Sequence, residues 1–114
     1  MKQFIRKVKI IGTGSYVPEE VYTNEYLETL VPTNSVWIYE NVGIKERRVV
    51  SKNQTTSDLA TQAAKNALEN AGLAASDIEL IIVATATPDR KAPSTAAFVQ
   101  HKLNAYNAAA FDVS

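Results

Sequence analysis

Side chains that could carry out chemistry are few in this chain and lie far apart. The 114 residues contain no cysteine and one histidine, His101, which stands between Gln100 and Lys102 in a stretch with a helical pattern. Without a cysteine or a second histidine, the chain can supply neither a thiolate nucleophile nor the usual ligand sets of zinc. We therefore expect no cysteine nucleophile and no metal site here, and interpret His101 as a surface side chain.

Two glycines near the start could suggest a phosphate-binding loop. Gly12 and Gly14 follow the apolar residues Val8, Ile10 and Ile11, but no third glycine stands at dinucleotide spacing and no Gly-Lys-Ser/Thr follows. Both phosphate-loop fingerprints are therefore missing. The glycines favour a bend or a close approach of the backbone.

The single tryptophan, Trp37, lies in a short predicted helix over residues 34–41 that ends at Gly43. Its flat ring could pack in a core or form a platform for a ligand, and the sequence leaves both open. A basic cluster follows, made of Lys45, Arg47, Arg48 and Lys52. It could bind an anion, although charges that protect an exposed strand edge are the more economical interpretation.

The chain is organised around the apolar run from Leu80 to Ala84, which Pro88 closes. A continuous β-branched run is typical of a central parallel strand covered on both faces, so a charge at Val83 should unfold the domain. Around it we predict a first strand within residues 4–17, a helix over 24–30 capped by Thr23, a helix from the capping box Thr55–Asp58 to Gly72, a helix over 94–103 and a last strand over 107–113. This order predicts one α/β domain with βαβαβ topology and a parallel sheet.

The balance of positive and negative charges bears on which kinds of partner the protein can bind. Twelve Lys and Arg residues offset twelve Asp and Glu residues, so the basic footprint of a nucleic-acid binder is missing. No apolar run approaches the length of about 20 residues that spans a bilayer, and the start has no signal sequence. The expectation is a cytoplasmic protein that binds neither nucleic acid nor a membrane.

A series of short motifs resembles β-ketoacyl-acyl carrier protein synthase III, a branch of the thiolase-fold condensing enzymes. They run in order over nearly the whole chain: Gly12 to Pro18, Thr23-Asn24, Trp37-Ile38, Gly43-Ile44, Glu46-Arg47-Arg48, Thr56 to Ala60, Leu80 to Thr85, Thr87-Pro88-Asp89, Pro93 to Ala96 and Ala110 to Val113. The resemblance implies an acyltransferase that starts fatty acid biosynthesis by decarboxylative condensation of acyl-CoA with malonyl-acyl carrier protein. No cofactor is held permanently, and the coenzyme A thioester is the substrate.

In that family, a nucleophilic cysteine follows the segment that here reads Phe111 to Ser114, and a histidine and an asparagine belong to a second half. The resemblance therefore implies that residues 1–114 are a truncated N-terminal half-domain, inactive by itself. It also implies a spatial strand order 3-2-1 in a three-stranded parallel sheet, with the run from Leu80 in the middle. The last strand, Ala108 to Val113, would pair across the axis of a homodimer.

The same resemblance assigns binding roles to four positions. Trp37 matches the tryptophan that stacks on the adenine of coenzyme A, and Thr33 matches a polar contact to that base. Asn41 replaces an arginine of the family that contacts coenzyme A, which weakens the assignment of that contact. Ala92 replaces a phenylalanine that shapes the acyl pocket of the partner subunit, so a longer acyl group than acetyl is expected to fit.

Other functions remain open from the sequence. The chain could be a non-catalytic binding or dimerisation module, which a stop codon after Ser114 would favour, or part of a condensing enzyme of secondary metabolism with a non-acetyl donor. A Rossmann-type nucleotide binder shares the element order but lacks the glycine fingerprint.

Overall fold

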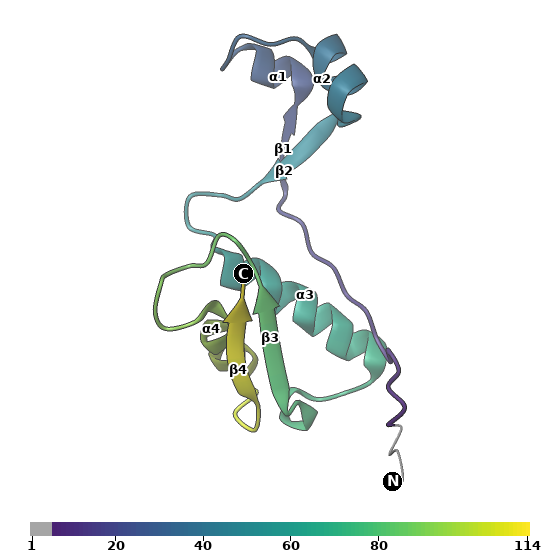
Figure 1. The fold of residues 1–114 in the computed structure, drawn as a ribbon, viewed down its shortest axis with the longest axis vertical. Coiled ribbons are helices and arrows are strands. Elements are labelled where there is room, and N and C mark those ends of the chain that lie inside the picture. The colour runs from purple at the N-terminus through teal and green to yellow at the C-terminus, as the bar shows by residue number, and fades with distance from the viewer. Residues whose placement is uncertain (1–5) are drawn as a thin grey trace, which may run out of the picture. The chain divides into compact units, whose positions relative to one another are not determined.

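The computed structural model describes residues 6–114, which form two compact units: residues 17–55, and residues 6–16 together with 56–114. The elements, in chain order, are β1 (Glu20–Thr23), α1 (Asn24–Glu28), α2 (Ser35–Val42), β2 (Glu46–Val49), α3 (Thr56–Ala71), the 3₁₀ helix η1 (Ala75–Asp77), β3 (Leu80–Ala84), α4 (Thr95–Leu103) and β4 (Ala109–Val113) (Figure 1). No helix among these described residues is long and apolar enough to cross a membrane.

The unit of residues 17–55 is an antiparallel pair of strands, β1 and β2, joined by the two short helices. Thr23 caps α1 by accepting a hydrogen bond from the Tyr26 amide at 3.2 Å, as predicted. Asn34 caps α2 in the same way through the Trp37 amide at 2.8 Å, and Gly43 ends that helix with a φ of 74°. The sequence did not predict β1, because its four residues, Glu-Val-Tyr-Thr, lack an apolar run.

Asn24 and Arg47 hold this unit together. Asn24 is buried, and its Nδ2 donates to the carbonyl of Ile44 at 2.8 Å while its Oδ1 accepts from Arg47 at 2.8 Å. Arg47 also donates to the carbonyl of Tyr22, and Arg48 donates to that of Pro18. Two members of the basic cluster are thus engaged with backbone carbonyls of their own unit.

In the second unit, α3 and α4 pack against one face of the β3–β4 sheet. Val99, Leu103, Ala105 and Ala108 form the buried core, and partly buried side chains of α3 and β3 surround them. The alanine-rich face of α3 contributes Ala60 and Ala64 to this contact. Their small side chains let the helix lie close, as the sequence predicts, and Gly72 ends α3 with a φ of 67°.

The parallel sheet has two strands among the described residues, β3 and β4, in a register that pairs Leu80 with Ala109 and Ala84 with Val113. The predicted third strand does not form within residues 6–17, and Phe4 and Ile5 lie outside the described residues. Residues 12–15 lie along α3 instead, where Asn70 accepts from the Thr13 amide at 3.1 Å and Asn66 donates to the Ser15 carbonyl at 2.9 Å. These side chains satisfy backbone groups that a neighbouring strand would otherwise pair.

Both glycines of this segment allow the close approach. A Cβ on Gly12 would come within 2.6 Å of the Ala71 Cβ, and one on Gly14 would come within 2.8 Å of the Ala67 Cα. Such distances are far below a normal van der Waals contact. The prediction of close backbone packing at these glycines is confirmed.

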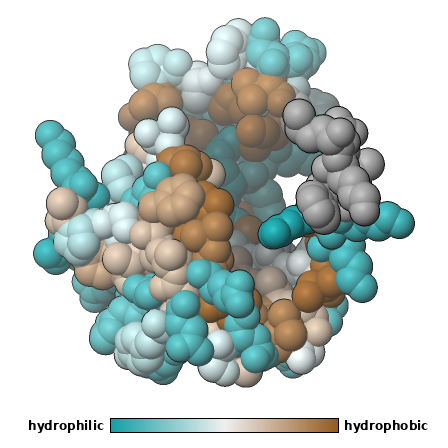
Figure 2. All heavy atoms as spheres, turned by 60° about the horizontal axis from the view of Figure 1, so that its bottom comes forward, coloured by the Kyte–Doolittle hydropathy of each residue, from teal (hydrophilic) through white to brown (hydrophobic). Residues whose placement is uncertain are grey.

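The prediction that β3 is covered on both faces is wrong for this chain. Ile81 and Val83 pack against the core, whereas Leu80 and Ile82 on the opposite face are 50% and 52% exposed. Their neighbours on β4, Phe111 and Val113, are also exposed. Successive strand residues point to opposite faces, and α3 and α4 cover only one of them. Hydrophobic side chains therefore reach the molecular surface (Figure 2).

Candidate functional site

Trp37 and Thr33, which are expected at the adenine of coenzyme A, and Asn41, which replaces an arginine of the family, all lie in the unit of residues 17–55. Helix α2 places Trp37 and Asn41 one turn apart, so that they share a face of the helix. Trp37 is 56% exposed, which excludes packing in the core of this chain and leaves the ligand platform as the open interpretation. Thr33 is partly buried and directly precedes Asn34, the N-cap of α2.

Asn41 is engaged with its own helix. Its Nδ2 donates to the Trp37 carbonyl at 2.9 Å. An amide held in this way carries no charge and points along the helix, whereas an arginine would extend a cationic group beyond it.

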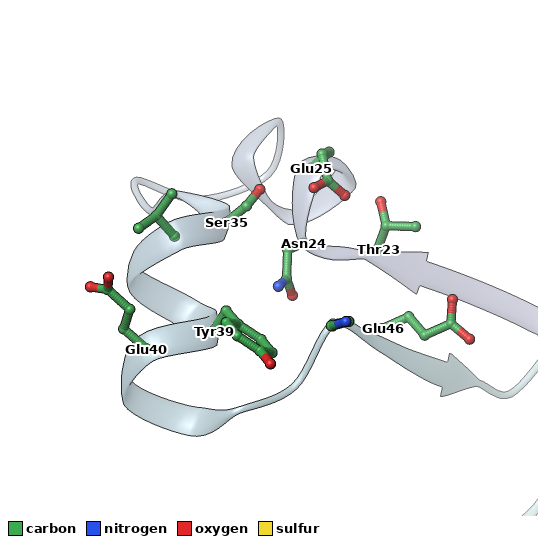
Figure 3. Close-up of a pocket in the computed structure, with 9 residues that line it drawn as sticks. Thr23, Asn24, Glu25, Ser35, Tyr39, Glu40 and Glu46 are labelled. Atoms are coloured by element: carbon green, nitrogen blue, oxygen red, sulfur yellow. The ribbon is translucent and has the colours of Figure 1, made fainter.

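A pocket of about 480 Å³ opens on another face of α2 (Figure 3). Asn24 and Tyr39 point into the space between α2 and the strands, and the Lys45 Nζ lies 5.4 Å from the centre of the Tyr39 ring. The lining residues are Thr23, Asn24, Glu25, Ser35, Val36, Tyr39, Glu40, Lys45 and Glu46. Sequence analysis missed this pocket, because its walls come from four short segments whose charges show no motif.

Two glutamates next to this pocket are held by hydrogen bonds. Glu28 accepts from both the hydroxyl and the amide of Ser35 at 2.6 Å, and these bonds lower the pKa of its carboxyl group. The pKa of Glu25 is lowered first by its own backbone amide and then by the hydroxyls of Thr23 and Ser35. Glu28 thus lies at the start of α2, where the helix dipole also stabilises negative charge, whereas Glu25 lies in the first turn of α1.

The carboxyl ends of β3 and β4 form a second hollow, of about 350 Å³, lined by Ala84, Thr85, Ala86, Val113 and Ser114. Ligands of α/β sheets commonly bind at this end of the strands. The Thr85 amide donates to the Val113 carbonyl at 3.0 Å. Next to it, the carboxylate of Asp112 accepts from the amides of Thr95 and Ala96 at the start of α4.

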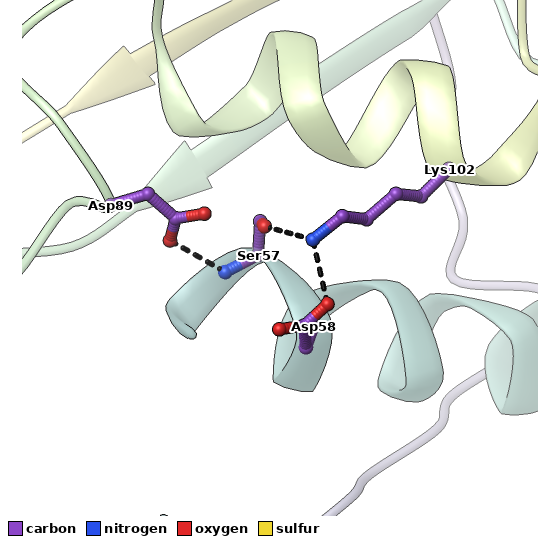
Figure 4. A network of polar contacts seen from close by, with 4 residues as sticks. All are labelled: Ser57, Asp58, Asp89 and Lys102. Atoms are coloured by element: carbon purple, nitrogen blue, oxygen red, sulfur yellow. Dashed lines mark hydrogen bonds and ion pairs between the residues drawn. The ribbon is translucent and has the colours of Figure 1, made fainter. Parts of the chain in front are cut away.

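A polar network joins α3, α4 and the loop after β3 (Figure 4). Lys102 donates to the Ser57 hydroxyl and pairs with Asp58, both at 2.6 Å, and the Ser57 amide donates to Asp89 at 2.9 Å. A serine beside a lysine can act as a nucleophile with its base. Ser57 is fully buried, however, so a substrate cannot reach it, and the network ties elements together instead.

The remaining predicted positions lie at the surface. His101 is exposed, with its ring 6.4 Å from that of Tyr106, as predicted. Ala92 is exposed in the loop between β3 and α4. Within residues 6–114, no group of three or more His, Asp or Glu side chains could hold a metal ion.

The fold and sequence match one group of known proteins. The crystal structure of 3-oxoacyl-[acyl-carrier-protein] synthase III from Aquifex aeolicus superposes with a TM-score of 0.88 at 51% identity, over 93% of this chain and 34% of that one. The priming β-ketosynthase of the R1128 polyketide pathway gives a TM-score of 0.89 at 32% identity, over 93% of this chain and 32% of that one. No protein-family model matches the chain. These neighbours define the class: the chain has an α/β thiolase-like fold.

Relatives found by sequence similarity belong to one enzyme family within this fold class. The chain is 57% identical over 105 residues to the β-ketoacyl-[acyl-carrier-protein] synthase III of Caldanaerobacter subterraneus, covering 92% of this chain and 32% of the relative. It is 50% identical over 109 residues to the protein of the same name from Ehrlichia canis, covering 96% of this chain and 34% of the relative. The resemblance to β-ketoacyl-acyl carrier protein synthase III is confirmed, and the chain spans about a third of the length of these relatives.

Proposed function

We propose that this chain is the N-terminal third of an acyltransferase of the β-ketoacyl-acyl carrier protein synthase III type. The complete protein would condense an acyl-CoA with malonyl-acyl carrier protein. The observation that carries this proposal is the 57% identity over 105 residues to a protein of that name. The TM-scores to the 3-oxoacyl-[acyl-carrier-protein] synthase III and to the polyketide priming β-ketosynthase are nearly equal and favour neither fatty acid biosynthesis nor secondary metabolism.

In the proposed enzyme, this chain and the rest of the protein would carry out different parts of the condensation. Condensation needs a thiolate whose pKa is lowered at a helix N-terminus, together with donors that stabilise the oxyanion and carbanion. The chain contains no cysteine, so by itself it should transfer no acyl group. Its own share would be to bind coenzyme A and to build one wall of the reaction site at the carboxyl ends of β3 and β4.

The coenzyme A part of the proposal rests on α2. Trp37 presents an exposed indole, whose face suits stacking on adenine, and Thr33 lies four residues before it. Asn41, one turn further along, supplies no charge for the phosphates of coenzyme A. We therefore expect binding to be weak and to improve when a cation is restored at this position.

The test is a calorimetric titration of coenzyme A into the chain, with Trp37 fluorescence as a second signal. Trp37→Ala should abolish the heat of binding. Asn41→Arg should tighten binding by about tenfold, the factor for one charge-assisted hydrogen bond worth about 1.5 kcal/mol. The matched control is Val36→Arg, which adds the same charge on another face of α2, where Val36 is 64% exposed.

Two outcomes would contradict the adenine site. One is an unchanged heat of binding in Trp37→Ala. The other is an equal gain in affinity from Val36→Arg and Asn41→Arg, which would indicate a general attraction between charges instead of a site on the Trp37 face.

Ala92 bears on the choice of acyl donor. We propose that it lines the acyl pocket of a partner subunit, where its small side chain leaves room for a longer or bulkier group than acetyl. Its exposed position in the loop after β3 is compatible with contact to another chain. Ala92→Phe in the complete protein should shift the preference toward acetyl-CoA, and a native protein that rejects all longer donors would contradict the proposal.

We propose that the sheet of the complete protein has three parallel strands. In the predicted order 3-2-1, β4 is the third strand, β3 the second and central one, and the segment within residues 4–17 the first. An apolar groove of about 270 Å³, lined in part by Leu80, Ile81 and Ile82 of β3, supports this order. In the same unit, Val8 and Ile10 are 93% and 85% exposed and would gain burial as a third strand. The other edge, at β4, is where we propose that two copies of the enzyme pair.

A further inference from the structure

Asp112, the penultimate residue of β4, joins this strand to the start of α4 by two short hydrogen bonds. Its Oδ2 accepts from the Thr95 amide at 2.6 Å, and its Oδ1 accepts from the Ala96 amide at 2.7 Å. Thr95 and Ala96 are fully buried, so little water competes for these bonds. Two short bonds from a helix N-terminus to one carboxylate are charge-assisted and supported by the helix dipole.

The same contact continues into the loop after β3. The Thr95 hydroxyl accepts from the Asp89 amide at 3.3 Å, and the Asp89 carboxylate accepts from the Ser57 amide at 2.9 Å. Figure 4 shows the Asp89 end of this chain of bonds. The end of β4, the start of α4, the loop after β3 and the start of α3 are therefore linked through Asp112, Thr95 and Asp89, which we call the strand-end clamp.

The clamp adjoins the hollow at the strand ends through consecutive residues of β4. Val113 and Ser114, which follow Asp112, form part of the wall of that hollow. On the sheet side, Val113 is held through its carbonyl by the Thr85 amide. On the helix side, both carboxylate oxygens of Asp112 hold the strand, so the direction in which the backbone leaves β4 depends on this residue.

We infer that Asp112 is a positioning residue for acyl transfer, an inference that rests on the function proposed above. It fixes the end of β4 and, through Thr95 and Asp89, the loop that carries Ala92, and so it sets the shape of the hollow at the strand ends, where we place acyl transfer. Near-attack geometry tolerates little displacement, since an error of about 1 Å can cost about 100-fold in rate.

The first test uses the 114-residue chain and reads the clamp itself by amide hydrogen exchange. Asp112→Asn keeps the shape of the side chain but replaces one acceptor oxygen with an NH₂ donor. The amides of Thr95 and Ala96 should exchange at least about tenfold faster. The matched control is Asp77→Asn, an exposed carboxylate outside the clamp that accepts from the Ala74 amide at 2.8 Å, and it should leave the amides of Thr95 and Ala96 unchanged. Unchanged exchange in Asp112→Asn would overturn the inference.

The second test uses the complete protein and separates kcat from KM for the acyl-CoA. Asp112→Asn should lower kcat by about 100-fold, with KM within about twofold of its original value, because the adenine site lies on α2 and is untouched. Asp77→Asn should keep both constants within about threefold. An unchanged kcat, a loss expressed mainly in KM, or an equal loss in Asp77→Asn would each overturn the inference.

Two controls separate a failure of the inference from other causes: one detects a variant that does not fold, and the other detects that the proposed function itself is wrong. If circular dichroism shows that Asp112→Asn does not fold, Asp112→Glu takes its place; it keeps both oxygens but moves them by one methylene, and the same loss of kcat is expected. If the unaltered complete protein transfers no acyl group from coenzyme A, the proposed function is wrong. If the unaltered protein is active and Asp112→Asn or its substitute is equally active, only the positioning role is wrong.

Discussion

At the scale of single residues, the contacts that define the fold are mainly hydrogen bonds to carboxylates and the close approach of the backbone to α3 at Gly12 and Gly14. Asp112, Asp89 and Glu28 each accept backbone amides at or near the start of a helix. Sequence analysis did not assign a role to any of them. A carboxylate that caps a distant helix leaves no spacing pattern, because its partner is set by the fold.

Glu28 gives a prediction about pH. Its folded-state pKa lies below the ordinary value of 4.5, so its charged form stabilises the fold above pH 4.5, and this contribution is lost as the pH falls through the folded-state pKa. Glu28→Gln should therefore lower the Tm at pH 7, with the difference shrinking toward pH 3. Thermal unfolding by circular dichroism at several pH values measures this. Glu40→Gln, an exposed change of the same charge, should show a smaller difference at pH 7.

Gly14 gives a prediction about packing. A Cβ at this position would press on the backbone of α3 at Ala67, which cannot move aside as a side chain could. Gly14→Ala should reduce the free energy of unfolding by about 1–3 kcal/mol, the usual cost of overpacking. Chemical denaturation measures it, with Ser15→Ala as control, because Asn66 bonds only the carbonyl of Ser15. Equal stability of both variants would show that this segment does not lie against α3.

At the scale of elements, the β3–β4 sheet is one-sided in this chain. The apolar run from Leu80 to Ala84 predicts a strand correctly, but it does not say what covers each face. Ile81 and Val83 face α3 and α4, whereas Leu80 and Ile82 face outward. A continuous apolar run is typical of a strand buried on both faces, so the exposed face indicates a surface that further structure is expected to cover.

Neighbouring substitutions on β3 test this asymmetry. Val83→Asp would place an unpaired charge against the core and should cost several kcal/mol, enough to unfold a domain of ordinary stability. Ile82→Asp, one residue away on the exposed face, should leave the chain folded. Urea denaturation of both variants decides the matter, and unfolding of both would mean that Ile82 is covered in solution.

At the scale of the whole molecule, the free edge of β4 leads to a prediction about assembly. The Ala109 amide donates to the Glu79 carbonyl on the β3 side, so the Ala110 amide points to the open edge. If two copies of the complete protein pair through this edge, as proposed above, Ala110→Pro should weaken their association, because it removes that donor without breaking a bond to β3. Sedimentation would show a shift toward monomer, while Ala110→Ser, which keeps the amide, should stay dimeric. A dimer that survives the proline would rule out pairing through this edge.

Local chemistry and ordered motifs in the sequence were enough to predict the helix caps at Thr23 and Gly43, the strands over Leu80–Ala84 and Ala109–Val113, and the resemblance to the condensing enzymes. These features depend on residues close together in the chain, or on motifs whose order is itself a signal. Only the tertiary structure decided that residues 12–15 lie along α3, that one face of β3 is open, that Trp37 is exposed, and that Asp112 holds the start of α4. Each of these depends on which surfaces meet across long stretches of chain, and contacts between distant residues are set by packing of the whole fold.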